Sequence, residues 1–190
     1  MLLSKIMKVG TVLCVLLAMS IGVVSAQSVE EKRQDNRNIA SATLREVYKL
    51  QPDAKMTVGN AAGYAAFKLT DARQLFIYSG VGNGIAVDNA TGQEVFMKTR
   101  DIQVGFDLQI KKYSVLFVFG TQKAFSDFVN GDWQVSSQAT VAANDSIAGD
   151  SLQGAIPVSA DVWMYKVTDK GLGYSPILRG VRYFRDSELN

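Results

Sequence analysis

The 190-residue chain contains no histidine, and its single cysteine, Cys14, lies within the first 26 residues. Without histidine, neither a Ser-His-Asp triad nor a Cys-His pair can be assembled. Zinc and most transition-metal sites also lose their usual nitrogen and sulfur ligands. The composition therefore leaves only carboxylate chemistry and metal binding through oxygen atoms, and it favours a protein that is not an enzyme.

The first 26 residues have the three parts of a secretory signal peptide. Lys5 and Lys8 precede an apolar run over residues 9–24, and small residues follow at Ser25 and Ala26. The pattern predicts cleavage after Ala26 and export, with the periplasm as the expected location in a bacterium. The alternative is an uncleaved N-terminal anchor, because the run approaches the ~18 residues of a spanning helix.

Residues 27–190 are long enough to form one domain with its own core. Once Lys5 and Lys8 are removed, the 18 remaining basic residues balance the 18 acidic ones. A neutral domain lacks the basic footprint that nucleic-acid binding usually needs, so nucleic acid is not an expected partner. Attraction to an anionic surface would have to come from a local cluster of cations.

Residues 27–50 contain neither glycine nor proline. Ala40, Leu44, Val47 and Tyr48 recur at helical spacing and form one apolar stripe. The spacing predicts a helix that ends before Pro52. Because residues 27–36 are strongly polar, we expect the first turns to project from the domain or to fray.

Residues 53–190 consist of short apolar runs separated by turn residues, which is typical of β-structure. We expect a hairpin over residues 87–95, a glycine-rich bend between strands at 80–84, and a short helix after Thr121 that buries Phe125 and Phe128. The expected strands lie near residues 62–67, 75–79, 84–88, 93–98, 102–110, 114–119, 133–143, 158–166, 172–175 and 178–184. The predicted fold class is α+β, with a curved antiparallel sheet or barrel-like core, an N-terminal helix and one short internal helix.

Two segments invite a chemical interpretation. The glycine-rich run 80–84 follows a strand, but Ile85 stands where a dinucleotide fingerprint requires a third Gly or Ala. Asp145 and Asp150 share a polar loop, yet paired carboxylates act as acid and base only in a pocket that shifts their pKa values. The sequence therefore gives no catalytic residue, no metal site and no cofactor.

Basic residues are the more suggestive feature. The candidate lipid-binding residues are Arg33, Arg37, Arg45 and Lys49 on the first helix, and Lys111 and Lys112 at an expected hairpin turn. Such cations could contact anionic lipid headgroups. The alternative is an ordinary solvated face, because Glu30, Glu31 and Glu46 share the helix. Arg179, Arg182 and Arg185 add cations to the last expected strand.

The order of several short motifs resembles the SYLF domain family. The motifs include Gly63-Tyr64-Ala65-Ala66-Phe67, Gly80-Val81-Gly82-Asn83-Gly84 and Gln103-Val104-Gly105-Phe106, and they continue through residues 112–119, 124–128, 131–135, 137–142, 157–158 and 169–172 to Gly180. The match covers about residues 40–190. The resemblance implies a non-catalytic lipid-binding module; some eukaryotic members also bind actin, and bacterial members are often exported.

These observations predict an exported SYLF-like domain that binds anionic phospholipid or the envelope surface. The alternative, from a different class, is a structural or protein-interaction module of the periplasm without lipid affinity. The resemblance assigns no lipid-binding residue and no protein partner.

Overall fold

The computed structural model describes residues 27–74, 77–104, 112–131, 133–134, 154–168, 170–172 and 181–190, with the backbone alone for 71–74, 77–79 and 101–104. The predicted signal peptide, most of the predicted 133–143 strand, Asp145 and Asp150 lie outside these residues. Of the helices in the described ranges, none combines the length and apolar character needed to cross a bilayer.

The N-terminal helix α2 runs from Val29 to Leu50 and confirms the predicted helix. Ser28 caps it: its hydroxyl accepts from the Glu31 N–H, and the Glu31 carboxylate accepts from the Ser28 N–H. This reciprocal capping box satisfies backbone donors that the first turn would otherwise leave unpaired. At the other end, the Gln51 N–H donates to the Val47 carbonyl before Pro52 stops the helix.

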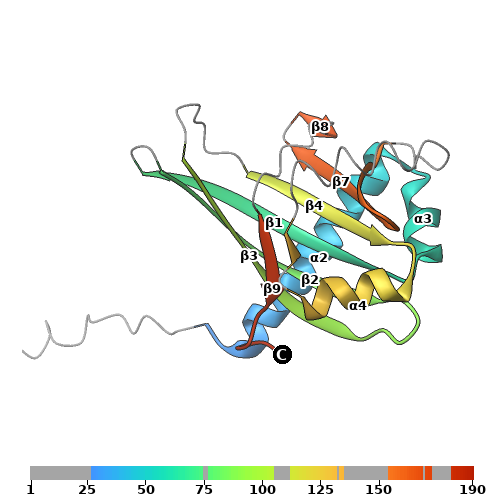
Figure 1. The fold of residues 1–190 in the computed structure, drawn as a ribbon, viewed down its shortest axis with the longest axis horizontal. Helices are drawn as coiled ribbons and strands as arrows, with labels where there is room; N and C mark the ends of the chain where they lie inside the picture. Colours follow the sequence, from blue (N-terminus) through green and yellow to red (C-terminus); the bar gives the residue numbers. More distant parts are fainter. Residues whose placement is uncertain are drawn as a thin grey trace, which may run out of the picture.

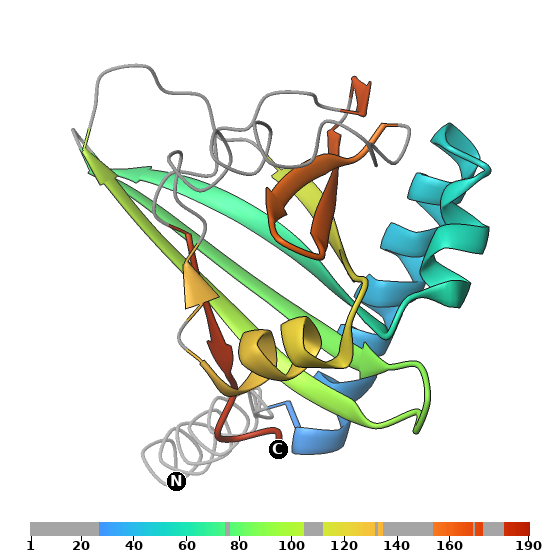
Figure 2. The ribbon, with the colours of Figure 1, turned by 45° about the vertical axis from the view of Figure 1, so that its right-hand side comes forward.

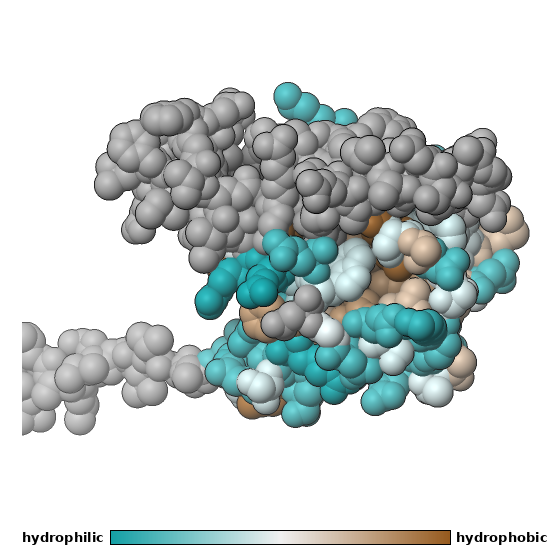
Figure 3. All heavy atoms as spheres, in the orientation of Figure 1, coloured by the Kyte–Doolittle hydropathy of each residue, from teal (hydrophilic) through white to brown (hydrophobic). Residues whose placement is uncertain are grey.

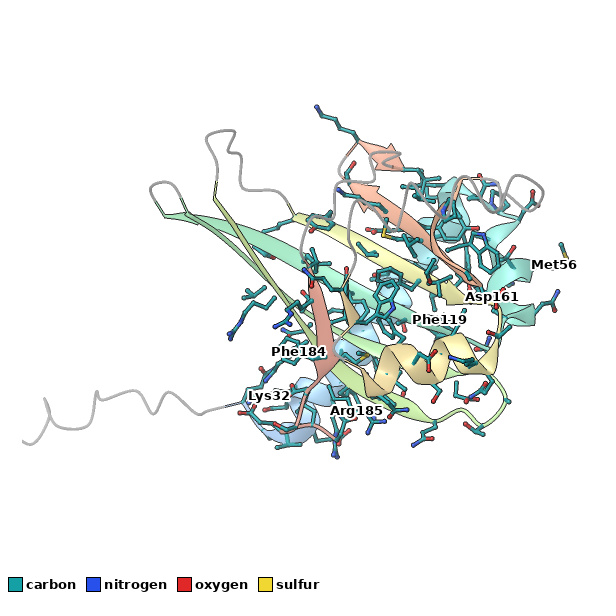
Figure 4. All side chains as sticks on the ribbon, in the orientation of Figure 1. Lys32, Met56, Phe119, Asp161, Phe184 and Arg185 are labelled. Atoms are coloured by element: carbon teal, nitrogen blue, oxygen red, sulfur yellow. The ribbon has the colours of Figure 1, made fainter. Side chains whose placement is uncertain are left out.

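A second helix, α3 (Ala54–Asn60), lies within the region that the sequence predicted as β-rich. Its seven residues follow a proline and contain Gly59, so local signals did not reveal it. Ala54 and Val58 are buried, whereas Met56 is 68% exposed and points outward (Figure 4). The Asn89 amide donates to the carbonyls of Val58 and Ala61, which fixes the end of α3 to the β2–β3 turn.

Within the described residues, nine strands form one antiparallel sheet in the order β5-β9-β3-β2-β1-β4-β7-β6, with β8 also paired to β7 (Figure 1). The strands are β1 (Gly63–Gln74), β2 (Ile77–Asp88), β3 (Glu94–Val104), β4 (Lys112–Phe119), β5 (Trp133–Gln134), β6 (Ile156–Ser159), β7 (Val162–Thr168), β8 (Gly171–Leu172) and β9 (Arg182–Arg185). A third helix, α4 (Gln122–Asn130), follows β4. The α+β fold class with a curled antiparallel sheet is therefore confirmed.

The glycine-rich run 80–84 is part of β2, so its prediction as a bend between two strands is wrong. β2 continues through it in unbroken register with β1 and β3. A methyl group at Gly84 would overlap the Ala66 carbonyl oxygen and the Phe67 ring, and one at Gly82 would lie 2.7 Å from the Lys68 carbonyl oxygen. The glycines therefore let large side chains of β1 lie across β2.

The sheet curls toward the face that carries its aromatic core. Tyr183 of β9 and Phe117 of β4 are separated by three strands, yet their ring centroids lie 5.1 Å apart. Phe128 of α4 closes this concave face, with its ring 5.5 Å from Phe117 and 5.7 Å from Tyr183. Figure 3 shows hydrophobic residues above the hydrophilic outer surface of α4.

Phe125 and Phe128 are both buried beneath the sheet, as the short capped helix predicted. The Thr121 hydroxyl accepts from the Ala124 N–H at the start of α4. At the other end, Arg185 donates to the Val129 carbonyl oxygen at 2.9 Å. Arg185, one of the cations on the last strand, therefore holds a helix terminus.

Helix α2 lies on the opposite, convex face of the sheet (Figure 2). Its predicted apolar stripe is confirmed: Ala40 and Val47 are buried, and Leu44 and Tyr48 pack beside them. The sheet residues of this second core are Ala66, Ile85, Phe96, Leu116, Val118, Tyr165 and Val167. Each face of the sheet thus has its own hydrophobic cluster.

The first turns of α2 form a regular capped helix and neither project nor fray, so that expectation is wrong. They pack against the last five residues of the chain, here called the C-terminal segment (186–190). Arg33 Nε donates to the Leu189 carbonyl at 2.9 Å, and Lys32 lies 3.5 Å from Glu188 at this end of the sheet (Figure 4). The Asn190 amide accepts from the Phe96 N–H and donates to the Phe96 carbonyl. Its side chain thereby pairs with the edge of β3 just beyond β9.

Candidate functional site

Two of the candidate cations on α2 serve internal contacts. The Arg33 and Arg37 guanidiniums lie 5.7 Å and 5.5 Å from the centre of the Phe96 ring. Arg37 also forms ion pairs with Glu30 and Glu94, both at 2.9 Å. The hydrogen bond from Arg37 is the main cause that lowers the pKa of the Glu30 carboxyl. About one third of each arginine side chain stays exposed. The contacts of both with Phe96, and that of Arg37 with Glu94, join α2 to the sheet.

The other candidates are placed differently. Arg45 and Lys49 are exposed on α2, and Lys112 is exposed at the start of β4. Lys111 lies outside the described residues. Lipid contact at these positions stays a prediction.

Strand register assembles a larger group of cations on the convex face. We define the basic patch as Lys68, Arg100, Lys112 and Arg182, which come from β1, β3, β4 and β9. Residues directly opposite one another in an antiparallel pair share a face of the sheet. One row across the sheet reads Arg182, Arg100, Val81, Thr70 and Lys112.

The neighbouring row lies one step closer to α2. It reads Phe184, Lys98, Asn83, Lys68 and Ser114. Along β1 this row is two residues from Ala66, which packs beneath α2 on the convex face. Period-two alternation therefore places Lys68 on the same side of the sheet as the helix. The basic patch occupies the part of the convex face next to the helix-covered part.

The four cations of the patch are exposed and, among the described residues, none has a hydrogen bond or an ion pair. Lys98 between them differs, because its ammonium lies 3.0 Å from Asp186 and 3.6 Å from Glu188. Its pKa is raised chiefly by the hydrogen bond to Asp186. Lys98 is thus neutralised internally, whereas no acidic residue in the described part of the chain pairs with a cation of the patch.

Val81 lies at the centre of the patch and is 57% exposed. A large apolar side chain surrounded by cations matches the chemistry of a membrane interface, where headgroups are anionic and the adjoining layer is apolar. In the described part of the chain, acidic residues do not gather in a group that could hold a metal ion. The arrangement is suited to binding an anionic surface.

Sequence reasoning found only part of this site. Lys112 was a candidate and Arg182 was noted on the last strand, but Lys68 and Arg100 were not singled out. Each of these residues is one of several polar residues in its strand, so local composition does not single it out. Only the pairing of strands distant in sequence brings the four together.

No family model matches the chain. It is similar to Beta cell expansion factor A of Aeromonas veronii, with 25% identity over 169 residues. That alignment covers 88% of this chain and 62% of the relative. The chain therefore spans less than two thirds of the relative's length, and the likeness indicates distant homology.

Proposed function

We propose that this chain is a SYLF-like, non-catalytic protein that binds anionic lipid surfaces through the basic patch. The order of its motifs, the distant homology and the absence of histidine support this assignment. The observation that carries it is the group of four cations around the exposed Val81, none of which forms an ion pair with a described residue.

A bilayer fits the patch better than a small anion does, because the four cations spread over strands from β9 to β4. Each basic residue near an anionic membrane contributes about 1 kcal/mol of attraction. Four such residues together supply about 4 kcal/mol, which corresponds to roughly a thousandfold change in affinity. Val81 adds apolar contact at the same place.

The test is sedimentation with vesicles of phosphatidylglycerol and phosphatidylcholine. In the patch variant Lys68, Arg100, Lys112 and Arg182 are all changed to Gln. We expect binding to anionic vesicles to fall by orders of magnitude, because the attraction is electrostatic and screened by salt. Binding to pure phosphatidylcholine should hardly change.

A charge-matched control separates this patch from bulk charge. It changes Arg45, Lys49, Lys55 and Lys170, which are exposed elsewhere, to Gln. The proposal expects this variant to retain most of its binding. An equal loss in both variants would move the contact to α2 or make it non-specific. A wild-type protein that ignores all vesicles would favour the protein-interaction module instead.

We further propose that the protein is exported and that Gln27 becomes its first residue. The signal-peptide pattern of residues 1–26 supports this proposal. Intact mass measurement of protein from the periplasmic fraction should give a chain that begins at Gln27. Recovery of the uncleaved chain in the membrane fraction would support the anchored alternative.

A further inference from the structure

We propose that Arg100 and Arg182 form a clamp for a phosphomonoester group at the β3–β9 end of the basic patch. The inference deepens the proposed function and rests on it for the lipid source of that group. It assigns a chemical preference to two residues, beyond general attraction to negative charge.

The two arginines are direct cross-strand neighbours, since β3 and β9 pair with Arg100 opposite Arg182. Opposed residues in an antiparallel pair have Cβ atoms only ~5 Å apart, and like charges there repel. Among the described residues, neither side chain has an acidic partner to offset this repulsion. An anion held by both guanidiniums would replace repulsion by attraction.

The backbone on which the clamp stands is held firmly. Thr99 and Tyr183, which pair beside the two arginines, are buried on the concave face. The Tyr183 ring lies 4.9 Å from the Phe67 ring, which ties β9 to the core. Arg182 also pairs with Gln134 of β5, so β9 has a neighbour on each side. The bases of the two side chains are therefore set by the core and need no rearrangement on binding.

Guanidinium chemistry favours phosphate at this position. Each planar guanidinium offers parallel N–H donors that match two phosphate oxygens, whereas an ammonium acts as a point charge. Two adjacent guanidiniums carry two positive charges, which a phosphomonoester with nearly two negative charges matches better than a singly charged phosphodiester. The preference should therefore depend on arginine geometry as well as on charge.

The experiment compares phosphatidic acid with phosphatidylglycerol in vesicles adjusted to equal surface charge. The wild-type protein should prefer phosphatidic acid by about tenfold, the scale of one or two added charge-assisted hydrogen bonds. The decisive variant, Arg100→Lys with Arg182→Lys, keeps the charge and removes the bidentate donors. It should bind phosphatidylglycerol as the wild type does and lose the preference.

A second arm distinguishes the source of the phosphate. Glycerol 3-phosphate and inorganic phosphate are titrated while the Nε resonances of Arg100 and Arg182 are followed by NMR. Shifts of both resonances on addition of phosphate, but not on addition of chloride in sulfate-free buffer, would support a clamp that also accepts free phosphate. A preference seen only with vesicles would support the clamp with a lipid headgroup as its ligand.

The clamp and the proposed function can fail separately. If the wild type binds both lipids equally, or if the double lysine variant keeps the preference, the clamp is overturned while lipid binding stands. If the wild type binds no vesicle and phosphate moves neither resonance, both are overturned. A cooperative thermal unfolding transition shows that the double lysine variant is folded. Its lipid preference is the ratio of its own affinities for the two lipids, so a low yield of protein does not change it.

Discussion

The concave face of the sheet and the uncovered part of its convex face differ in how far their side chains are buried or paired. On the concave face, the rings of Phe67, Phe117, Phe128 and Tyr183 fill the curl of the sheet and are fully or almost fully buried. On the convex face beyond α2, Lys68, Arg100, Lys112 and Arg182 lie exposed, and no described acidic residue pairs with them. One face therefore serves stability, and the other keeps its charges available.

The part of the convex face beneath α2 shows that this chain pairs its cations where structure requires it. Arg37 binds Glu30 and Glu94, and Lys98 binds Asp186. The paired Lys98 and the exposed Arg100 thus lie two residues apart on the same strand, β3. The difference teaches that the unpaired group is the place to look for a ligand.

The largest effect is expected on the concave face. Phe128→Ala should lower the free energy of unfolding by about 3–5 kcal/mol, because the ring is fully buried among other rings. Urea unfolding followed by tryptophan fluorescence measures this loss, since Trp133 lies 5.2 Å from Phe128. Phe128→Leu serves as the milder control. A loss below about 1 kcal/mol would show that α4 is peripheral to the core.

A smaller effect is expected where α2 covers the convex face. Arg37→Gln removes two exposed ion pairs and the contact with the Phe96 ring, so we expect a loss of about 1 kcal/mol in stability. Vesicle binding should hardly change, because the side chain is already occupied. Lys55→Gln, at an exposed position on α3, is the control. Unchanged stability together with weakened vesicle binding would restore α2 as the lipid contact.

A modest effect that depends on pH is expected at the end of the concave face. Asp88 accepts hydrogen bonds from the N–H groups of Thr91 and Ala90 and from the Gln122 amide. These hydrogen bonds lower the pKa of the Asp88 carboxyl, and the bond from the Thr91 N–H has the largest effect. The resulting stability is complete above the unfolded value of about 3.9 and is lost as pH falls through the lower folded-state pKa. Asp88→Asn should flatten the stability curve below about pH 4, measured by urea unfolding across pH.

The smallest effect is expected within the basic patch itself. Arg100→Thr removes the like-charge pair with Arg182 and should raise stability by about 0.2–0.5 kcal/mol at low salt. The gain should fade as salt screens the repulsion, which thermal unfolding at two ionic strengths would reveal. Lys112→Thr, whose direct partner is the uncharged Thr70, is the control. A gain of equal size in the control would mean that the Arg100–Arg182 pair carries no special repulsion.

Local signals were sufficient for the elements whose ends are marked in the sequence. The apolar stripe and Pro52 predicted α2, Thr121 predicted the start of α4, and the turn residues after Asp88 predicted the β2–β3 hairpin. The continuity of β2 could not be predicted, because glycine usually weakens strands and its role here depends on Phe67 of a neighbouring strand. The prediction for the first turns of α2 failed for a similar reason, because they pack against the C-terminal segment, which is distant in sequence.

The basic patch was beyond sequence reasoning because it depends on register. A shift of one residue between β3 and β9 would move Arg182 to the concave face. The register follows from the burial of Tyr183 and Val181, which only the folded core reveals. The grouping of cations on one helix was visible in the sequence, whereas the grouping of cations from four strands was not.

The contacts of the C-terminal segment also constrain how the molecule is made. Arg33 contacts Leu189, which is synthesised 156 residues later. On the ribosome, α2 emerges well before this partner, so its contacts with the C-terminal segment can form only after residues 186–190 have been translated. A copy interrupted before Asp186 would leave the Phe96 backbone groups uncovered at a strand edge and Lys98 without its carboxylates. Until residues 186–190 are in place, this strand edge stays open and is a site that a housekeeping protease could attack.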